Sequence, residues 1–465
     1  MTLYEILPSL QHAATPRIDR AIWPLTAHVD ELGRLCVGGV PLTEVADEFG
    51  TPTYVIDETD FRHRIRRYRT AFPEARLTYA GKALLTTAIA RWVAEEGAGL
   101  GVCSDGALAT ALVAGADPNR IILHGEAITP SELRKAASVG VGRIVVAGPT
   151  QVALLASATG RPQAVQVRVA PDIDIHEHSS VTAGQTDLAL TNAHAAAAVE
   201  RILDQPLLYL VGLHCNLGPQ VTDASLYGEA IRQMVPLMAD VRARHGVILT
   251  ELSIGGGQGI PYVSGDSELD LDELRDFIDD ALDASCAAER FPRPTIAIEP
   301  GRAISARAGV TLYRVLSVQS QPGGRTTAVV DGGLGDNPGD ALQDTRYSVA
   351  LANRHPITPS RPTTVVGRHC ESGDEIARDV PLPDDLRAGD LLAVACTGAY
   401  HHTMASTFNM VGRPPLVAVK DGRIRELVRR ETIADLLSRD RACNESPPMR
   451  RDRVACGYEA LLHGE

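Results

Sequence analysis

Short apolar runs recur along the chain, and the segments between them carry apolar residues at helical spacing. LLTTAIARWVAEEG and GALATALVAGA, for example, show the period of amphipathic helices. Eight runs have the length and composition of buried strands: RLTYAGK, GLGVCS, RIILHG, RIVVAG, VQVRVA, YLVGLHC, ELSIGGG and TIAIEPG. Eight strands, each followed by a helix, predict an α/β fold with a TIM-type (β/α)8 barrel; a doubly wound sheet would alternate in the same way, but the count favours the barrel.

The pattern changes after Arg302, where strand-like runs follow one another without helices. GVTLYRVLSVQSQ, TTAVVDGG, GDLLAVACTGAY and PPLVAVKDGRIREL are punctuated by glycine and proline, and they predict a C-terminal β domain. The N-terminal stretch LTAHVDELGRLCVGGV predicts a strand pair that joins this domain. We therefore divide the chain into an N-terminal segment, 1–48, a barrel, 49–304, a β domain, 305–435, and a charged, loosely packed tail, 436–465.

Composition and charge favour a small-molecule partner. The 465 residues are 44% apolar and 22% charged, and the net charge of −13 argues against nucleic acid or an anionic membrane as a partner. No apolar run approaches the length that spans a bilayer, and the N-terminus lacks a secretory pattern, so we expect a cytoplasmic protein. The eight cysteines are scattered without a CxxC pair, which predicts reduced thiols and neither a disulfide framework nor a metal site.

Lys82, in YAGKALL, stands between an apolar strand and an apolar helix, where a buried ammonium would be costly. Either its charge meets water at the wet end of the strand, or it faces a site at the mouth of the barrel. Reactive groups of TIM barrels gather where strands end, and desolvation there makes a neutral amine available to a carbonyl. Lys82 is therefore a candidate nucleophile.

The seventh and eighth predicted strands end in polar or glycine-rich sequence. GGGQG, residues 255–259, can turn tightly and direct backbone N–H groups at a phosphate, although alone it would also suit a flexible loop. Its position raises its significance, because phosphate sites recur after strands seven and eight of TIM barrels. EPGR places Glu299 and Arg302 next to this loop, where they could otherwise form an ordinary surface pair.

Six motifs, taken together in this order, carry a family resemblance: YAGKA, GLHCNLGPQ, SIGGGQGIPY, EPGRAI, CESGDEIA and TGAYHHTMASTFN. Between residues 23 and 431 the chain resembles the diaminopimelate decarboxylases, which are relatives of ornithine decarboxylase and the bacterial alanine racemases. The resemblance implies pyridoxal 5'-phosphate as cofactor, a barrel with a C-terminal β domain, and a homodimer with active sites at the subunit interface. The CESGD element resembles the decarboxylase version rather than a racemase.

By this resemblance, Lys82 bonds covalently to the cofactor and Glu299 lies against the pyridine nitrogen, which strengthens the ring as an electron sink. Cys370 and Glu371 would enter from the other subunit, the thiol to return a proton and the carboxylate to meet the distal end of the substrate. Gly255, Gly256 and Gly257 would hold the phosphate by their backbone N–H groups. Arg302 would lie near the phosphate or the substrate carboxylate, and Tyr400 would complete that pocket.

The sequence departs from the family pattern at the cofactor site. The family usually reads HxHIGSQ where this chain has HCNLGPQ, so Asn216 replaces a histidine that packs on the cofactor ring, and Pro219 replaces a phosphate-binding serine. Proline supplies neither a hydroxyl nor a backbone N–H. We place the retained His214 and the substituted Asn216 in the cofactor site. In GVCSDGA, Gly101 and Ala107 stand where the family has an aspartate and a glutamate.

The substrate pocket departs as well. In DNPGDALQDTRY, Gly339 and Gln343 stand where the resemblance predicts a substrate-binding arginine and a tyrosine. Loss of a guanidinium from a buried carboxylate site should weaken binding by roughly 2–5 kcal/mol. The candidate substrate contacts are then Arg302, Arg346, Glu371, Gln343 and His401. His401 and His402 could read a new substrate or move protons, or they could be solvent-exposed loop histidines.

Three hypotheses follow. The first is a pyridoxal-phosphate-dependent decarboxylase of an amino acid, with an altered pocket that serves a specialised biosynthesis. The second is a genuine meso-diaminopimelate decarboxylase that makes L-lysine. The third is a catalytically impaired homologue that keeps the fold for binding or regulation; Lys82, Glu299, Cys370 and Tyr400 together argue against it.

Overall fold

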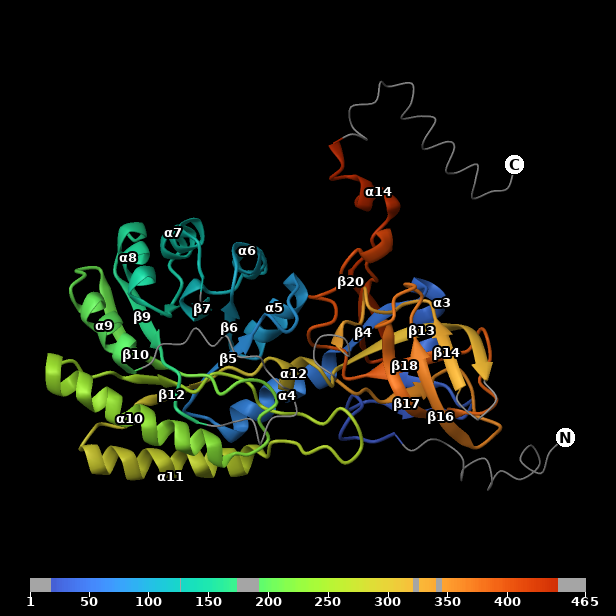
Figure 1. Cartoon of the computed structure of the whole chain (residues 1–465), viewed down its shortest axis with the longest axis horizontal. Helices are drawn as coiled ribbons and strands as arrows, with labels where there is room; N and C mark the ends of the chain where they lie inside the picture. The colour runs from blue at the N-terminus through green and yellow to red at the C-terminus, as the bar shows by residue number, and fades with distance from the viewer. Residues whose placement is uncertain (1–17, 126, 174–191, 321–325, 340–344, 442–465) are drawn as a thin grey trace.

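The computed structural model describes residues 18–441 except 126, 174–191, 321–325 and 340–344. A barrel surrounded by helices and a mixed β-sheet lie side by side (Figure 1). Most of the tail, from residue 442 onward, lies outside the described residues.

The barrel is closed by eight parallel strands, and each forms from one of the eight predicted runs. In spatial order they run β10-β11-β12-β5-β6-β7-β8-β9. The strands are β5 (Arg76–Ala80), β6 (Gly99–Val102), β7 (Ile121–Leu123), β8 (Arg143–Val146), β9 (Gln163–Arg168), β10 (Leu208–His214), β11 (Glu251–Ser253) and β12 (Thr295–Ile298). The TIM-type barrel is thereby confirmed, and the doubly wound alternative is wrong.

Helices cover the outside of the barrel, which is why its strands are continuous apolar runs rather than alternating ones. Several helices begin at a residue whose side chain caps the free backbone N–H groups: Asp57 before α4, Thr129 before α7 and Asp270 before α11. The helices are α4 (Glu58–Ala71), α5 (Thr87–Glu95), α6 (Asp105–Val113), α7 (Pro130–Val139), α8 (Pro149–Ala158), α9 (Asn192–Leu203), α10 (Ser225–His245), α11 (Leu271–Glu289) and α12 (Arg302–Ser305).

The second part is a nine-stranded mixed sheet. Its long strand β13 (Gly309–Ser320) pairs through its first half with β4 and β18, and through its second half with β14. The other strands are β4 (Thr53–Asp57), β14 (Thr326–Val330), β15 (Val349–Leu351), β16 (Ser360–Val366), β17 (Glu375–Pro383), β18 (Leu391–Ala395), β19 (Leu416–Lys420) and β20 (Arg423–Val428). The predicted C-terminal β domain is confirmed, and β4 is the strand from the N-terminal region that joins its sheet.

The predicted N-terminal strand pair forms and contacts the β domain. β1 (His28–Val29), β2 (Leu35–Val37) and β3 (Val40–Pro41) make a three-stranded sheet of their own. Two backbone hydrogen bonds tie it to the β domain, from Leu35 N to Ala352 O at 3.0 Å and from Gly422 N to Gly38 O at 2.8 Å. The strand pair therefore joins the β domain as expected, as a small sheet beside the large one, and α3 (Leu42–Phe49) follows it.

The two parts meet at the carboxyl ends of the barrel strands. After β18 the chain turns back to the barrel, where Tyr400 N and Thr403 Oγ1 donate to Ala83 O at 2.9 and 3.3 Å. The β domain therefore closes one side of the barrel mouth. Among the described residues, no helix has the length and apolar character to cross a bilayer.

Candidate active site

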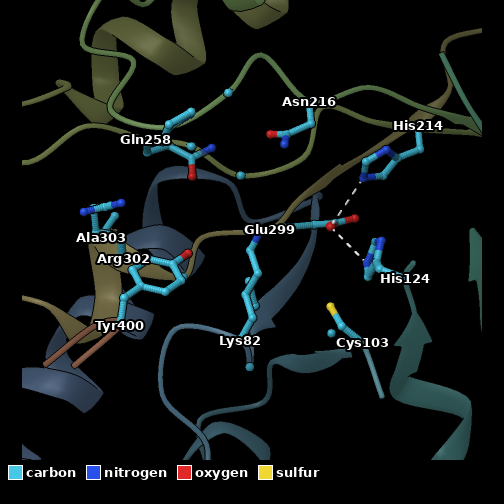
Figure 2. Close-up of a pocket in the computed structure, with 18 of the residues that line it drawn as sticks. Lys82, Cys103, His124, His214, Asn216, Gln258, Glu299, Arg302, Ala303 and Tyr400 are labelled. Atoms are coloured by element: carbon cyan, nitrogen blue, oxygen red, sulfur yellow. Dashed lines mark ion pairs between the residues drawn. The ribbon is translucent and has the colours of Figure 1, made fainter. Parts of the chain in front are cut away.

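A cavity of about 490 Å³ opens at the carboxyl ends of the barrel strands. Figure 2 shows Lys82 in its centre, with Arg302, Tyr400 and Gln258 to one side and Cys103, His124 and His214 to the other. It has the place and size of a small-molecule site in a barrel enzyme. The lining residues include Gly101, Asn216, Gly218, Pro219, Gly256, Gly257 and Glu299.

The backbone around Lys82 is fixed from three sides. Ala80 N donates to Pro300 O at 3.0 Å, and Gly81 N donates to Gly101 O at 2.9 Å, so the end of β5 is held by both neighbouring strands. The carbonyl of Ala83 accepts from the loop of the β domain described above. The Lys82 side chain itself is exposed to the cavity, so its amine faces the site and the backbone conformation is set before any ligand binds.

Glu299 is the buried acid of the cavity, 7% exposed at the end of β12. Ser253 Oγ donates to its Oε1 at 2.8 Å, and its Oε2 lies 3.1 Å from His124 Nε2 and 3.5 Å from His214 Nε2. Burial by itself would raise the pKa of the carboxyl, but the two imidazoles outweigh burial and hold that pKa well below its ordinary value. Burial lowers the pKa of His214. Glu299 is thus a carboxylate at neutral pH, able to accept from a ring N–H.

The glycine loop after β11 has no room for side chains. A Cβ at Gly255 (φ +67°) would lie 2.5 Å from Cys215 O, and one at Gly257 (φ +89°) would lie 1.8 Å from Gly218 O. Gly256 and Gly257 line the cavity. Gly255 does not reach it, because its N–H donates to Ser253 Oγ at 3.2 Å. Of the three predicted phosphate-binding glycines, the structure brings two to the cavity wall.

Arg302 and Tyr400 lie together at the opposite end of the cavity from the imidazoles (Figure 2). The guanidinium stacks 4.9 Å from the Tyr400 ring centre, and its Nη1 donates to Tyr262 Oη at 2.5 Å. Tyr400 has a positive φ of 62°, a strained conformation for a bulky residue that often marks a functional position. These aromatic contacts fix the orientation of the cation beside the glycine loop.

The predicted substrate residues are only partly brought to this cavity. A Cβ at Gly339 would meet the Tyr347 hydroxyl at 1.8 Å, so Tyr347 fills the space next to this glycine. Arg346 is 75% exposed and pairs with Asp266 at 3.3 Å. Gln343 lies outside the described residues.

His401 is 2% exposed, so the alternative of a solvent-exposed loop histidine is wrong for it. Its ring nitrogens lie 2.8 Å from Ala399 O and 3.1 Å from Asn337 Oδ1. Burial lowers the pKa of His401 to about 4, which makes the ring neutral at physiological pH. His402 is partly buried, edge-on to Tyr54. Neither histidine is among the residues that line the cavity.

Cys370 and Glu371 are exposed on the loop between β16 and β17 and do not line the cavity of their own chain. Asp374 holds the base of this loop, because its carboxylate accepts from His369 N at 2.7 Å and from Leu334 N at 2.5 Å. Cys370 has a φ of 57°, which a non-glycine residue rarely adopts and which costs roughly 1–3 kcal/mol. Cys370 is therefore an exposed residue with a strained backbone, on a loop whose base is held by Asp374.

Four residues of the cavity wall with polar or ionisable side chains, His124, Cys103, Gln258 and Arg168, were not among the sequence candidates. His124 follows β7, and a strand ending in histidine, RIILHG, was a signal that could have identified it. Cys103 and Gln258 follow β6 and β11 and face the same cavity. His124, His214 and Glu299 place donor atoms within 4.8 Å of one another, which would also suit a metal ion. The amine of Lys82 in the same cavity could instead bind the aldehyde of a cofactor.

The cavity fits the expected cofactor. Lys82 supplies the amine for an aldehyde, Glu299 supplies an acceptor for a pyridine N–H, and Arg302 with the glycine loop supplies cationic and backbone donors for a phosphate. Lys82, Glu299, Arg302 and the glycine loop all line one cavity. The exclusion of side chains at Gly257 is what leaves backbone exposed at the phosphate end.

Comparison with known proteins gives the same result. The family model described as the pyridoxal binding domain of pyridoxal-dependent decarboxylases matches residues 58–306. Diaminopimelate decarboxylase of Actinosynnema pretiosum subsp. auranticum is 48% identical over 444 residues, covering 95% of this chain and 100% of the relative. The corresponding protein of Mycobacterium tuberculosis is 41% identical over 433 residues, covering 90% and 97%.

Among solved structures, diaminopimelate decarboxylase from M. jannaschii in complex with L-lysine matches with a TM-score of 0.83 and 26% identity, covering 91% of this chain and 98% of that one. The matches include both the barrel and the β domain. The chain belongs to the diaminopimelate decarboxylase family of pyridoxal-phosphate-dependent enzymes.

Proposed function

We propose that this enzyme removes one carboxyl group from meso-diaminopimelate and releases L-lysine. The observation that carries the proposal is the 48% identity to a diaminopimelate decarboxylase over 95% of this chain. The aligned region includes the β domain as well as the cofactor barrel. This reading has more support than a decarboxylase for specialised biosynthesis with a different substrate. The intact Lys82, Glu299 and Arg302 set argues against a catalytically impaired homologue.

The residues of the cavity have distinct tasks in this reaction. When bound, the cofactor supplies a ring that accepts the electron pair left by the departing carbon dioxide. The Lys82 amine holds the cofactor until the substrate amine takes its place. Glu299 keeps a proton on the ring nitrogen, because its own carboxyl is ionised in the buried setting described above. Arg302, fixed between Tyr262 and Tyr400, neutralises the anionic end of the cofactor.

We also propose that the enzyme acts as a homodimer with shared active sites. Cys370 and Glu371 are exposed, lie on a loop whose base is held by Asp374, and are not among the residues that line the cavity of their own chain. A second copy of the chain would bring them over the open mouth of the partner's cavity, where the thiol returns a proton to the substrate carbon and the carboxylate meets the distal end. The exposure of both residues and the strained backbone of Cys370 suit this role.

A second candidate substrate is another amino acid related to diaminopimelate. Tyr347 occupies the space beside Gly339, so a guanidinium cannot extend from position 339 toward a distal carboxylate without displacing the tyrosine. A substrate without that distal carboxylate would fit such a pocket better. Ornithine and arginine are the probes for this alternative.

The experiment is product analysis with purified enzyme and cofactor, using meso-diaminopimelate, ornithine and arginine at equal concentrations. Release of carbon dioxide and L-lysine from meso-diaminopimelate, absent in Lys82→Ala, is the expected result. Faster turnover of another amino acid would identify that amino acid, rather than meso-diaminopimelate, as the substrate. No turnover of any probe, together with no visible cofactor absorbance, would support the binding homologue instead.

A further inference from the structure

Gln258 is held in a fixed position where two loops of the cavity wall run side by side. The loop after β10 and the loop after β11 form a parallel bridge between Val221 and Gln258. Val221 N donates to Gly257 O at 2.9 Å, and Gly259 N donates to Val221 O at 2.8 Å. These hydrogen bonds fix the backbone on both sides of Gln258, and they therefore fix the position in the cavity wall from which its side chain extends.

The amide of Gln258 is buried without a protein partner. The residue is 2% exposed, and neither Oε1 nor Nε2 has a hydrogen-bond partner among the described residues. Leaving such a group unsatisfied is costly, and native structures keep few of them without a function. The group lines the cavity, so a ligand bound there can complete its hydrogen bonds.

Gln220 provides an internal comparison, because it lies in the same pair of loops and is similarly buried, at 7% exposed. Its Nε2 donates to Ile260 O at 3.0 Å, and its Oε1 accepts from Ile260 N at 3.2 Å. Gln220 thus has a complete structural role in joining the loops. Gln258 has no such contacts among the described residues.

The ligand group that Gln258 faces is identified by its neighbours. Figure 2 shows its amide on the side of Arg302 and Tyr400, away from Glu299 and the imidazoles. Gly257, next to it in sequence, exposes backbone at the phosphate end. Pro219, also in the cavity wall, offers neither a hydroxyl nor an N–H. The loop after β10 therefore has no hydrogen-bond donor at Pro219, and the loop after β11 carries the unpaired amide donor of Gln258.

We propose that Gln258 is a cofactor-binding residue of this enzyme, whose Nε2 donates to the phosphate of pyridoxal 5'-phosphate and makes up for the absence of a donor at Pro219. The inference rests on the cofactor and not on the identity of the amino acid substrate. A hydrogen bond from a neutral amide to a phosphate is charge-assisted, which is the stronger class of hydrogen bond. Gln258 thus sets how tightly the phosphate end is held.

The test measures cofactor binding without substrate, in full-length protein freed of cofactor. Gln258→Leu is titrated with pyridoxal 5'-phosphate and, separately, with pyridoxal, which lacks the phosphate; binding is followed by visible absorbance. The variant should bind the phosphorylated form about 10-fold to 100-fold more weakly than wild type does. Its affinity for pyridoxal should be unchanged, because the lost contact is to the phosphate.

A second readout separates a ligand contact from a structural one. In the cofactor-free protein, Gln258→Leu should have a melting temperature equal to or above that of wild type, since an unpaired buried amide is replaced by an apolar side chain of similar size. Gln220→Leu, the matched control, should lower the melting temperature because it breaks two hydrogen bonds. Equal losses of affinity for both ligands in Gln258→Leu, or a lower melting temperature of its cofactor-free form, would overturn the proposal. Because no amino acid is present, failure of diaminopimelate as substrate leaves this result intact.

Discussion

At the scale of single residues, the proposed reaction depends on the ionised carboxylate of Glu299, which would keep the cofactor ring protonated and able to accept electrons. Glu299→Gln keeps the shape and the Ser253 contact but cannot hold a proton on the ring nitrogen by charge. We expect kcat to fall about 10²-fold to 10³-fold, as for loss of one preorganised electrostatic group. Steady-state kinetics at saturating cofactor measure this change.

The matched control is Glu251→Gln, a second buried acid on the neighbouring strand at the opposite end of the barrel. Glu251 pairs with Arg76 at 3.0 Å and with Arg143, and it accepts from Gln166 at 3.1 Å. Its replacement should lower the melting temperature while kcat per folded molecule stays at the wild-type value. An unchanged kcat in Glu299→Gln would contradict the role given to that carboxylate.

Site residues at the ends of strands were easier to predict from the sequence than residues whose side-chain orientation depends on a neighbouring loop. Lys82 and Glu299 follow directly from apolar runs, so their placement in one cavity needed only the barrel closure. Gln258 lay inside a motif that was recognised for its glycines. Its inward orientation depends on the bridge to Val221, which sequence spacing does not reveal.

At the scale of elements, barrel closure depends on a close approach of two strands at Gly212 of β10. A Cβ there would lie 2.0 Å from Glu251 O of β11, at a point where the register of β10 against β9 shifts. Gly212→Ala should therefore lower the free energy of unfolding by about 1–3 kcal/mol, as overpacking does elsewhere. Urea denaturation measures the change.

Gly160, between α8 and β9, is the control glycine, because no atom lies within 4 Å of a Cβ placed there. Gly160→Ala should leave the free energy of unfolding within about 0.5 kcal/mol of wild type, as at other open surface positions. Equal stability of the two variants would show that β10 and β11 can separate at little cost, contrary to the close contact in the structure.

The elements themselves were readable from the sequence, but their pairing was only partly so. Strands buried on both faces give apolar runs, which is why all eight barrel strands were found. β4 places its residues between β13 and β19, partners more than two hundred residues further along the chain. Local pattern carries no information about such distant pairing, so the sequence did not reveal that β4 lies inside the large sheet.

At the scale of the whole molecule, one buried acid makes stability depend on pH. Asp336 is 4% exposed, and burial raises its pKa to about 7 despite hydrogen bonds from Tyr313 Oη and Gly333 N. The folded chain therefore binds a proton that the unfolded chain has already released, so stability falls as pH rises from about 4 to about 7. Above the folded-state pKa the penalty is fully present.

Asp336→Asn removes this titration and should be more stable than wild type at pH 8. The difference should grow by about 1.4 kcal/mol for each pH unit up to about pH 7 and then stay constant. Urea denaturation of both proteins between pH 5 and pH 8 gives the comparison. A constant difference across that range would mean that Asp336 is already ionised in the fold at pH 5.

The proposed shared active site belongs to the scale of the whole molecule, and mixed dimers test it directly. Lys82→Ala and Cys370→Ala chains, each with its own affinity tag, are coexpressed, and only dimers that carry both tags are kept. If Cys370 serves the partner's cavity, one site of such a dimer pairs an intact lysine with an intact thiol, and about half of the wild-type activity per dimer is expected.

The control dimer combines a wild-type chain with a chain that carries both substitutions. In a shared arrangement neither of its sites has both Lys82 and Cys370, so its activity should be far below half. If each subunit used its own Cys370, the two results would be exchanged: the first dimer would be impaired at both sites, and the control would keep one complete site. Cys370 is exposed and is not among the residues that line the cavity of its own chain, which predicts the shared outcome.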